Sequence, residues 1–122
     1  MYPGSPPCPR HQRTQLDFEM CAEQREVELN LRFDRLVAAL WPILDATGRA
    51  EFARGQAGWA QYQKEECDVG AREFLGGSEA PLAGEECRVG LIRARVTEVS
   101  GMLTMYCQGK VLTGPYRRCP RQ

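Results

Sequence analysis

The stretch Gln56-Ala-Gly-Trp59-Ala-Gln-Tyr62-Gln-Lys-Glu-Glu-Cys67 decides how the rest of this chain is interpreted. Residues three or four apart share one side of a helix, so a helix here would carry a tryptophan, two glutamines and a cysteine on one face. A ring as large as that of Trp59 needs neighbours on several sides, and this helix is therefore predicted to be the central one. The complete face consists of Phe52, Gln56, Trp59, Gln63 and Cys67.

A second cysteine, Cys87, follows Cys67 about twenty positions later, and a glycine turn, Gly76-Gly77-Ser78, lies midway between them. Two helices folded back at this turn would bring both sulfur atoms to the same height, which predicts a Cys67–Cys87 disulfide. Six cysteines allow fifteen pairings. Cys8–Cys21 and Cys107–Cys119 are the expected companions, on short sequence separation alone.

The number and spacing of the cysteines indicate an oxidising compartment. The six cysteines are spread along the whole chain without a close C-x-x-C pair of the kind found in zinc and redox sites. Three disulfides are the preferred interpretation, and a cytosolic protein with buried thiols is the alternative. No apolar run approaches the length of a membrane span, and the first residues lack a signal-peptide core. We therefore expect an exported protein whose signal peptide has been removed.

The pattern of helix signals predicts one all-α domain, residues 1–122, with a core at about 8–107. Thr14 followed by Asp17 is typical of a helix start, and the first helix is expected to reach Trp41, before Pro42. Thr47-Gly48 marks a turn. Further helices are predicted at about 49–74 and from Pro81 onward. The expected fold is a disulfide-stapled bundle of three main helices with an irregular N-terminal arm (1–12) and a basic C-terminal tail (108–122).

Apolar stripes predict how these helices pack. The later part of the first helix carries one stripe and the third helix carries a longer one. Glycines in the second helix are interpreted as points of close helix approach rather than as breaks. The residues concerned are Leu29, Phe33, Leu36 and Leu40; Leu82, Val89, Ile92, Val96, Val99, Leu103 and Tyr106; and Gly55, Gly58 and Gly70.

Charge and motif content argue against several classes of function. Sixteen basic and sixteen acidic residues cancel, so no global field favours nucleic acid or an anionic membrane. The single histidine, His11, lies in the arm without catalytic or metal-binding companions. G-x-S-x-G and phosphate-loop motifs are absent. We expect no enzyme activity, no metal and no cofactor.

Two polar features have a structural and a functional interpretation. Gln56 shares a face with Trp59, so its amide needs a hydrogen-bond partner, either the backbone or Arg95; a ligand contact is the alternative. We expect Gln56, Trp59, Tyr62 and Arg95 to belong to the structural core. A Cys67–Cys87 bond would also gather four carboxylates, which solvated helix faces explain more simply than an acid–base or calcium site. These are Glu65, Glu66, Glu85 and Glu86.

Three blocks of residues resemble the LprI-like lysozyme-inhibitor N-terminal family in order and spacing, over about residues 8–103. The first is Cys8, Thr14-Gln-x-x-x-x-Met20-Cys21 and Leu29-Asn30-x-x-Phe33-x-x-Leu36. The second is Gln56-x-x-Trp59-x-x-Tyr62 with Cys67, and the third is Cys87-x-x-x-Leu91-x-x-x-Arg95. Gln63-Lys64 stands where the family often carries Arg-Asp, and the tail after Gln108 lies outside the family pattern.

This resemblance implies a helical, disulfide-bonded binding protein of the bacterial periplasm or exterior, with lipid-anchored forms in the family. The expected function is inhibition of a lysozyme-type muramidase; the alternative is an envelope interaction or toxin-immunity protein with another protein partner. A cleft lined by carboxylates would suit a basic loop. Positive charge alone therefore identifies a set of candidate partner-binding residues in the arm and the tail. The set is Arg10, Arg13, Lys110, Arg117 and Arg118.

Overall fold

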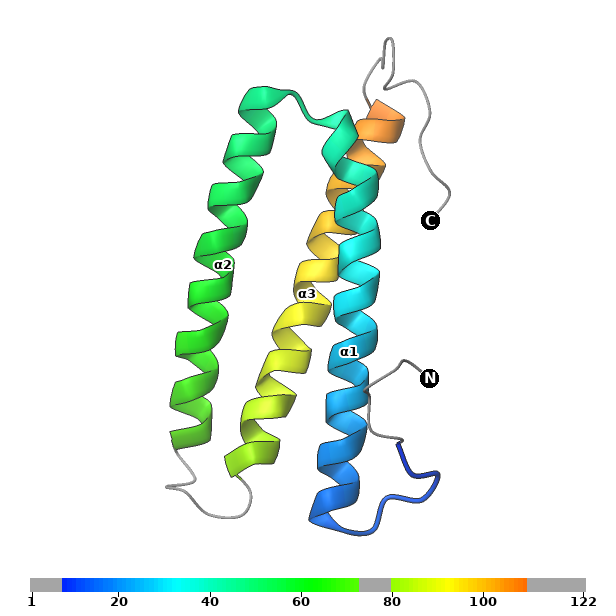
Figure 1. The fold of residues 1–122 in the computed structure, drawn as a ribbon, viewed down its shortest axis with the longest axis vertical. Helices are drawn as coiled ribbons and strands as arrows, with labels where there is room; N and C mark the ends of the chain where they lie inside the picture. Colours follow the sequence, from blue (N-terminus) through cyan, green and yellow to red (C-terminus); the bar gives the residue numbers. More distant parts are fainter. Residues whose placement is uncertain (1–7, 73–79, 110–122) are drawn as a thin grey trace.

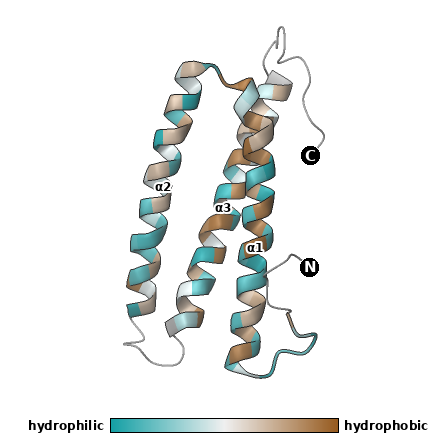
Figure 2. Ribbon diagram, viewed as in Figure 1, coloured by the Kyte–Doolittle hydropathy of each residue, from teal (hydrophilic) through white to brown (hydrophobic). Residues whose placement is uncertain are grey.

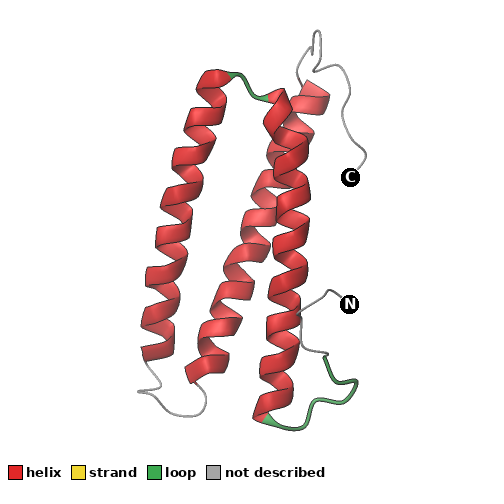
Figure 3. Cartoon of the chain, viewed as in Figure 1, coloured by secondary structure: helices red, strands yellow, loops and turns green. Residues whose placement is uncertain are grey.

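A computed structural model describes residues 8–72 and 80–109 of the chain (Figure 1). Helix α1 spans Gln15–Leu40 and continues into a short 3-10 helix, η1, at Trp41–Ile43. Helix α2 spans Ala46–Arg72 and α3 spans Ala80–Gly109. The three long helices run up, down and up, so α1 and α3 are parallel (Figures 1 and 3). All regular secondary structure among the described residues is helical, as predicted.

Helix boundaries follow from local capping. The Thr14 side chain accepts a hydrogen bond from the N–H of Asp17, and the Asp17 carboxylate accepts one from the N–H of Thr14, which forms a capping box. At the other end of α1, Pro42 falls within η1, where α1 stops. The predicted turn at Thr47-Gly48 is wrong, because Asp45 caps α2 three residues earlier than expected: its Oδ1 accepts from the Gly48 N–H at 2.7 Å.

The central helix is α3, which corrects the prediction that the Trp59 helix is central. Helix α3 packs along both α1 and α2, whereas α2 makes little contact with α1. Apolar residues are accordingly concentrated along α1 and α3 (Figure 2). The buried cluster comes from α1, η1, the residue that follows it and α3, and no buried residue of α2 belongs to it. Its members are Leu36, Leu40, Ile43, Leu44, Val96, Val99 and Leu103.

Helix α2 turns the predicted face toward the bundle but buries it only in part. Phe52, Gln56, Trp59 and Gln63 are half-buried, and Cys67 is the buried residue of this helix. The expectation that Trp59 has neighbours on several sides in the structural core is therefore too strong. Tyr62, predicted to lie in the core, is 53% exposed. It precedes Gln63 directly and falls outside the half-buried stripe, because successive helical residues point about 100° apart.

The glycines of α2 do not mark close helix contacts, which corrects their interpretation. A Cβ added at Gly55, Gly58 or Gly70 would find no heavy atom within 4 Å. These residues lie within a continuous helix and face open space, so they neither break α2 nor let α3 approach more closely.

Two disulfides tie segments to the bundle, as predicted. Cys67–Cys87 joins α2 to α3 with a Cα–Cα distance of 5.4 Å, and Cys8–Cys21 joins the N-terminal segment to α1 at 4.4 Å. The predicted third bond involves Cys119, which lies outside the described residues.

Candidate functional site

Residues 8–12 of the predicted N-terminal arm, with the two residues that join them to α1, are held against that helix, and from here on the arm denotes residues 8–14. Its disulfide to Cys21 is supplemented by a hydrogen bond of 2.7 Å from the Cys8 N–H to the Gln24 side-chain oxygen. Arg10 and Arg13, both nominated for partner binding, have exposed side chains here. The arm therefore presents cationic groups from a loop that is fixed at both ends.

The C-terminal end of the arm is fixed through its backbone. The N–H groups of Arg13 and Thr14 both donate to the Asp17 carboxylate, at 3.0 and 3.2 Å. These two bonds lower the pKa of Asp17 below its ordinary value, because they favour the charged carboxylate. The backbone of Arg13 is thus immobilised while its side chain points into solvent.

The arm lies at the opposite end of the bundle from the last described residue of α3. The arm precedes α1 at one end of the bundle, and α3 ends at Gly109 at the other end (Figure 1). The remaining nominated residues, Lys110, Arg117 and Arg118, lie outside the described residues. The arm is therefore the part of the predicted site whose placement is known.

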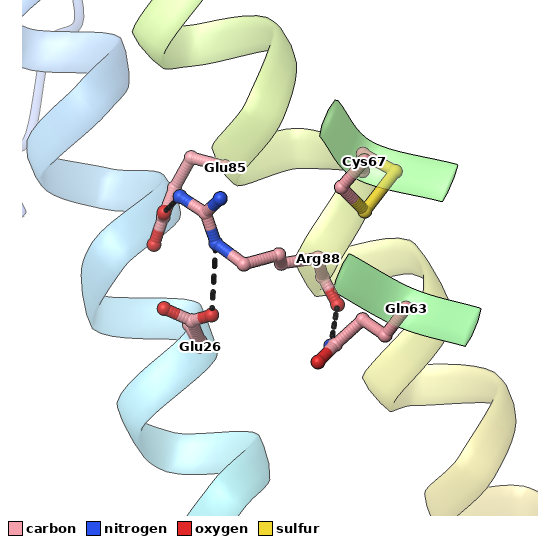
Figure 4. A network of polar contacts seen from close by, with 6 residues as sticks. Glu26, Gln63, Cys67, Glu85 and Arg88 are labelled. Carbon is pink, nitrogen blue, oxygen red and sulfur yellow. Dashed lines mark hydrogen bonds and ion pairs between the residues drawn. A yellow bond between two sulfur atoms is a disulfide. The ribbon is translucent and has the colours of Figure 1, made fainter. Parts of the chain in front are cut away.

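A polar network crosses from α1 to α3 beside the Cys67–Cys87 disulfide (Figure 4). The Arg88 guanidinium binds the carboxylate of Glu85 in its own helix and lies 3.4 Å from the Glu26 carboxylate of α1. The backbone carbonyl of Arg88 accepts a hydrogen bond of 3.5 Å from the Gln63 side chain of α2. One arginine thus contacts all three helices.

Two carboxyl groups, those of Glu26 and Glu85, compete for this one guanidinium. Burial, together with a hydrogen bond to Glu85 and its negative charge, raises the pKa of Glu26 to about 7, although Arg88 opposes the shift. Glu85 is only 6% exposed, and its Oε1 is buried without a hydrogen-bond partner among the described residues. A protonated Glu26 can donate a hydrogen bond to the Glu85 carboxylate, and a charged Glu26 cannot.

The same cluster raises the pKa of Arg88. Burial alone would lower it, but the hydrogen bond and the negative charge of Glu85 outweigh that effect, and Glu26 adds to them. This network was not predicted from the sequence. Glu26 and Glu85 meet only because α1 and α3 are parallel neighbours, and no local spacing in the sequence reports that arrangement.

The four carboxylates expected near the second disulfide do not converge on one site. Glu65 accepts from Gln61 at 2.8 Å, and Glu86 pairs with Arg25 of α1 at 2.6 Å, while Glu85 faces Arg88. Among residues 8–72 and 80–109, no group of three or more His, Cys, Asp or Glu side chains is arranged to hold a metal ion. The acidic residues here serve separate helix contacts.

The Gln56 amide has the partner expected from the sequence. The Arg95 Nε donates to the Gln56 side-chain oxygen at 2.9 Å, and the Arg95 guanidinium lies 5.5 Å from the centre of the Phe52 ring. Arg95 is only 7% exposed and also pairs with Glu98 at 3.5 Å. Its contacts place Arg95 in the structural core, joining α3 to α2.

Comparison with known proteins assigns the chain to a family. The family model described as "Lysozyme inhibitor LprI" matches residues 8–99. The chain belongs to this family. The match includes the arm, both described disulfides and the Glu26–Arg88 network. The LprI family is named for an inhibitor, and the role this implies is binding rather than catalysis.

Relatives of this LprI-family chain are distant. An uncharacterised protein of Rhizobium meliloti (strain 1021) is 27% identical over 103 residues, which cover 74% of each chain. No solved structure matches. None of the described helices is long and apolar enough to cross a membrane. The disulfides of this LprI protein are of the kind that persist in oxidising compartments outside the cytosol.

Proposed function

We propose that this LprI-family protein acts in the periplasm or outside the cell as an inhibitor of a lysozyme-type muramidase. The observation that carries the proposal is the family match over residues 8–99, which spans nearly the whole described bundle. Two disulfides within that span suit an exported protein that must persist beside a degradative enzyme. The partner is thus a folded protein, bound in a stoichiometric complex.

The arm is the element best suited to enter the substrate cleft of such an enzyme. Glycoside hydrolases generally place two carboxyl groups on either side of the scissile bond, so a muramidase cleft offers negative charge to an incoming cation. Arg10 and Arg13 are exposed on a segment held by a disulfide and by two backbone hydrogen bonds to Asp17. A loop fixed in this way loses less conformational entropy on binding than a free one.

The first experiment measures inhibition directly. Oxidised protein is added to a purified lysozyme that is clearing a suspension of bacterial cell walls, and complex formation is measured by calorimetry. The proposal expects saturable inhibition at a one-to-one ratio. Clearing that is unaffected at high excess, with no heat of binding, would contradict it. Capture of a different protein from envelope extract would then favour an interaction or immunity function.

A charge-reversal pair tests the arm. Arg10→Glu/Arg13→Glu should weaken inhibition by at least about tenfold, because the cations would become repulsive toward the carboxylates. The matched control is Arg54→Glu/Arg72→Glu on exposed positions of α2, which changes the net charge equally. Equal affinities for the two variants would remove the arm from the interface.

The tail residues are proposed as a second contact of the same kind. Lys110→Glu/Arg117→Glu/Arg118→Glu should weaken inhibition without changing the melting temperature, since these residues follow the last described helix. Unchanged inhibition by this variant would limit the contact to residues within the family match.

A further inference from the structure

A second basic site lies on the interface between α1 and α3. It is a cavity of about 320 Å³, here called the basic cavity. The α1 residues that line it recur at intervals of three, four and seven positions and therefore share one helix face. A single arginine of α3 closes the other side. The lining residues are Arg25, Glu28, Leu29, Arg32 and Arg93.

Positive charge in the basic cavity exceeds the negative charge available to it. Arg25 is neutralised by Glu86 at 2.6 Å. Within the described part of the chain, neither Arg32 nor Arg93 forms an ion pair, and both are exposed. The lining also contains one carboxylate, Glu28, so three arginines face two carboxylates, those of Glu28 and Glu86, and one positive charge is left over. An anion bound between Arg32 and Arg93 would offset the repulsion between their like charges.

The neighbouring part of the α1–α3 interface, around Arg88, has an excess of acidic side chains rather than basic ones. There, two carboxyl groups, Glu26 and Glu85, contact the single guanidinium of Arg88. Around Arg88 the α1–α3 interface thus has one carboxyl group more than it has guanidinium groups, whereas the basic cavity has one guanidinium group more than it has carboxylates. The excess positive charge of the basic cavity is therefore available to an anion from outside the chain.

Two successive hydrogen bonds link the arm to the lining of the basic cavity. The Cys8 N–H donates to the Gln24 oxygen at 2.7 Å, and the Gln24 side-chain nitrogen donates to Glu28 at 3.4 Å. Glu28 is itself part of the cavity lining. A partner that covers the arm would therefore meet the basic cavity on the same face of α1.

We infer that the basic cavity receives a carboxylate side chain from the protein partner, held between the guanidinium groups of Arg32 and Arg93. Guanidinium groups bind carboxylates through paired N–H donors, and two of them can share one carboxylate. Leu29 supplies an apolar wall for the methylene groups of an entering Glu or Asp. The inference rests on the proposed function, because it names a second contact with the same partner.

A protein carboxylate fits this site better than a polyanion does. The chain has equal numbers of acidic and basic residues, so it offers no extended field to a nucleic acid or an anionic membrane. An excess of one positive charge in a cavity of this size suits a single carboxylate, which a folded partner can present at a fixed position.

The test combines a charge reversal with its matched control. In Arg32→Glu/Arg93→Glu, affinity for a purified lysozyme should fall at least about tenfold, and the dependence of affinity on salt should become weaker. Arg54→Glu/Arg72→Glu carries the same net charge and should bind within about twofold of the unchanged protein. Circular dichroism checks that both variants fold. Wild-type affinity in the folded Arg32→Glu/Arg93→Glu variant would overturn the inference.

A second probe separates failure of this inference from failure of the proposed function. A short glutamate-rich peptide is titrated into the unchanged protein while the side-chain Nε–H signals of arginine are followed by NMR. Shifts at Arg32 and Arg93 that disappear in the charge-reversed variant support a carboxylate site, even if lysozyme is not the partner. No shift at either residue, or shifts only with a soluble peptidoglycan fragment, would overturn the assignment to a protein carboxylate.

Discussion

The interface between α1 and α3 and the one between α2 and α3 are held together by different forces. The first contains the apolar cluster, in which Leu40 and Val99 are completely buried. The second has Cys67 as its one buried α2 residue and relies on the Cys67–Cys87 bond and the contacts of Arg95 with Gln56 and Phe52. Apolar burial therefore stabilises the α1–α3 pair, whereas a disulfide and polar contacts hold α2 against α3.

This difference predicts where the molecule opens first. Burial of apolar side chains contributes about 25 cal/mol per Å², so the well-buried α1–α3 pair should separate only when the whole domain unfolds. Helix α2 can detach at a lower free energy. The arm and the basic cavity both belong to the stable pair, which gives the proposed partner a rigid surface.

The largest effect is expected from a cavity in the α1–α3 core. Leu40→Ala should lower the free energy of unfolding by about 2–5 kcal/mol, toward the upper end because Leu40 is 0% exposed. Chemical denaturation measures the change. The control is Leu16→Ala in the same helix, at a side chain that is 62% exposed, which should cost less than about 0.5 kcal/mol. Similar losses for the two variants would refute the assignment of the core.

Removing the α2–α3 disulfide should have the next largest effect. Cys67→Ala/Cys87→Ala opens a loop of about twenty residues and should cost about 3 kcal/mol. Hydrogen exchange should show the loss of protection concentrated in α2, with α1 and α3 less affected. Uniform loss of protection along all three helices would mean that α2 is as firmly packed as the other two.

A smaller effect is expected from pH at the Glu26–Glu85 pair. The folded-state pKa of Glu26, about 7, lies above the ordinary value of 4.5, so between these values the folded protein holds a proton that the unfolded chain has released. The free energy of unfolding should therefore fall as pH rises from about 5 to 7 and then level off. Because solvent screens the 25% exposed Glu26 side chain, the fall should be about 1–2 kcal/mol.

Glu26→Gln provides the control for this dependence. A neutral amide can donate to Glu85 at every pH, as a protonated Glu26 does. Denaturation of this variant between pH 5 and 8 should show a much flatter profile, and at pH 8 it should be more stable than the unchanged protein. An unchanged slope would place the responsible proton on another group.

The sequence predicted those parts of the fold that depend on local signals. The capping residues Thr14 and Asp17, the interruption at Pro42 and the Cys67–Cys87 pairing each follow from a short spacing, and each is confirmed. The long apolar stripe predicted for the third helix is also confirmed, since five of its residues are buried in α3: Val89, Ile92, Val96, Val99 and Leu103.

The order of the helices in the bundle could not be derived in the same way. The large ring of Trp59 suggested that α2 is central, but Trp59 is only half-buried. Helix α2 packs mainly against α3, so a large side chain on α2 can be covered on one side and still be exposed on the other. The neighbours of Glu26 and the lining of the basic cavity were missed for a related reason. Both depend on the parallel contact of α1 with α3, which joins residues about sixty positions apart.

The smallest prediction addresses the glycines of α2, which the sequence suggested were sites of close packing. Gly58 lies inside a continuous helix, and a Cβ added there would meet open space. Gly58→Ala should therefore raise the free energy of unfolding by about 0.5–1 kcal/mol, because alanine lowers the conformational entropy of the unfolded chain. Gly48→Ala is the matched comparison, because its Cβ would lie 3.2 Å from the Asp45 oxygen that caps the helix. Gly48→Ala should therefore gain less, and thermal unfolding of both variants measures the difference. Destabilisation by Gly58→Ala would show that α2 packs more closely on its neighbours than its exposed surface indicates.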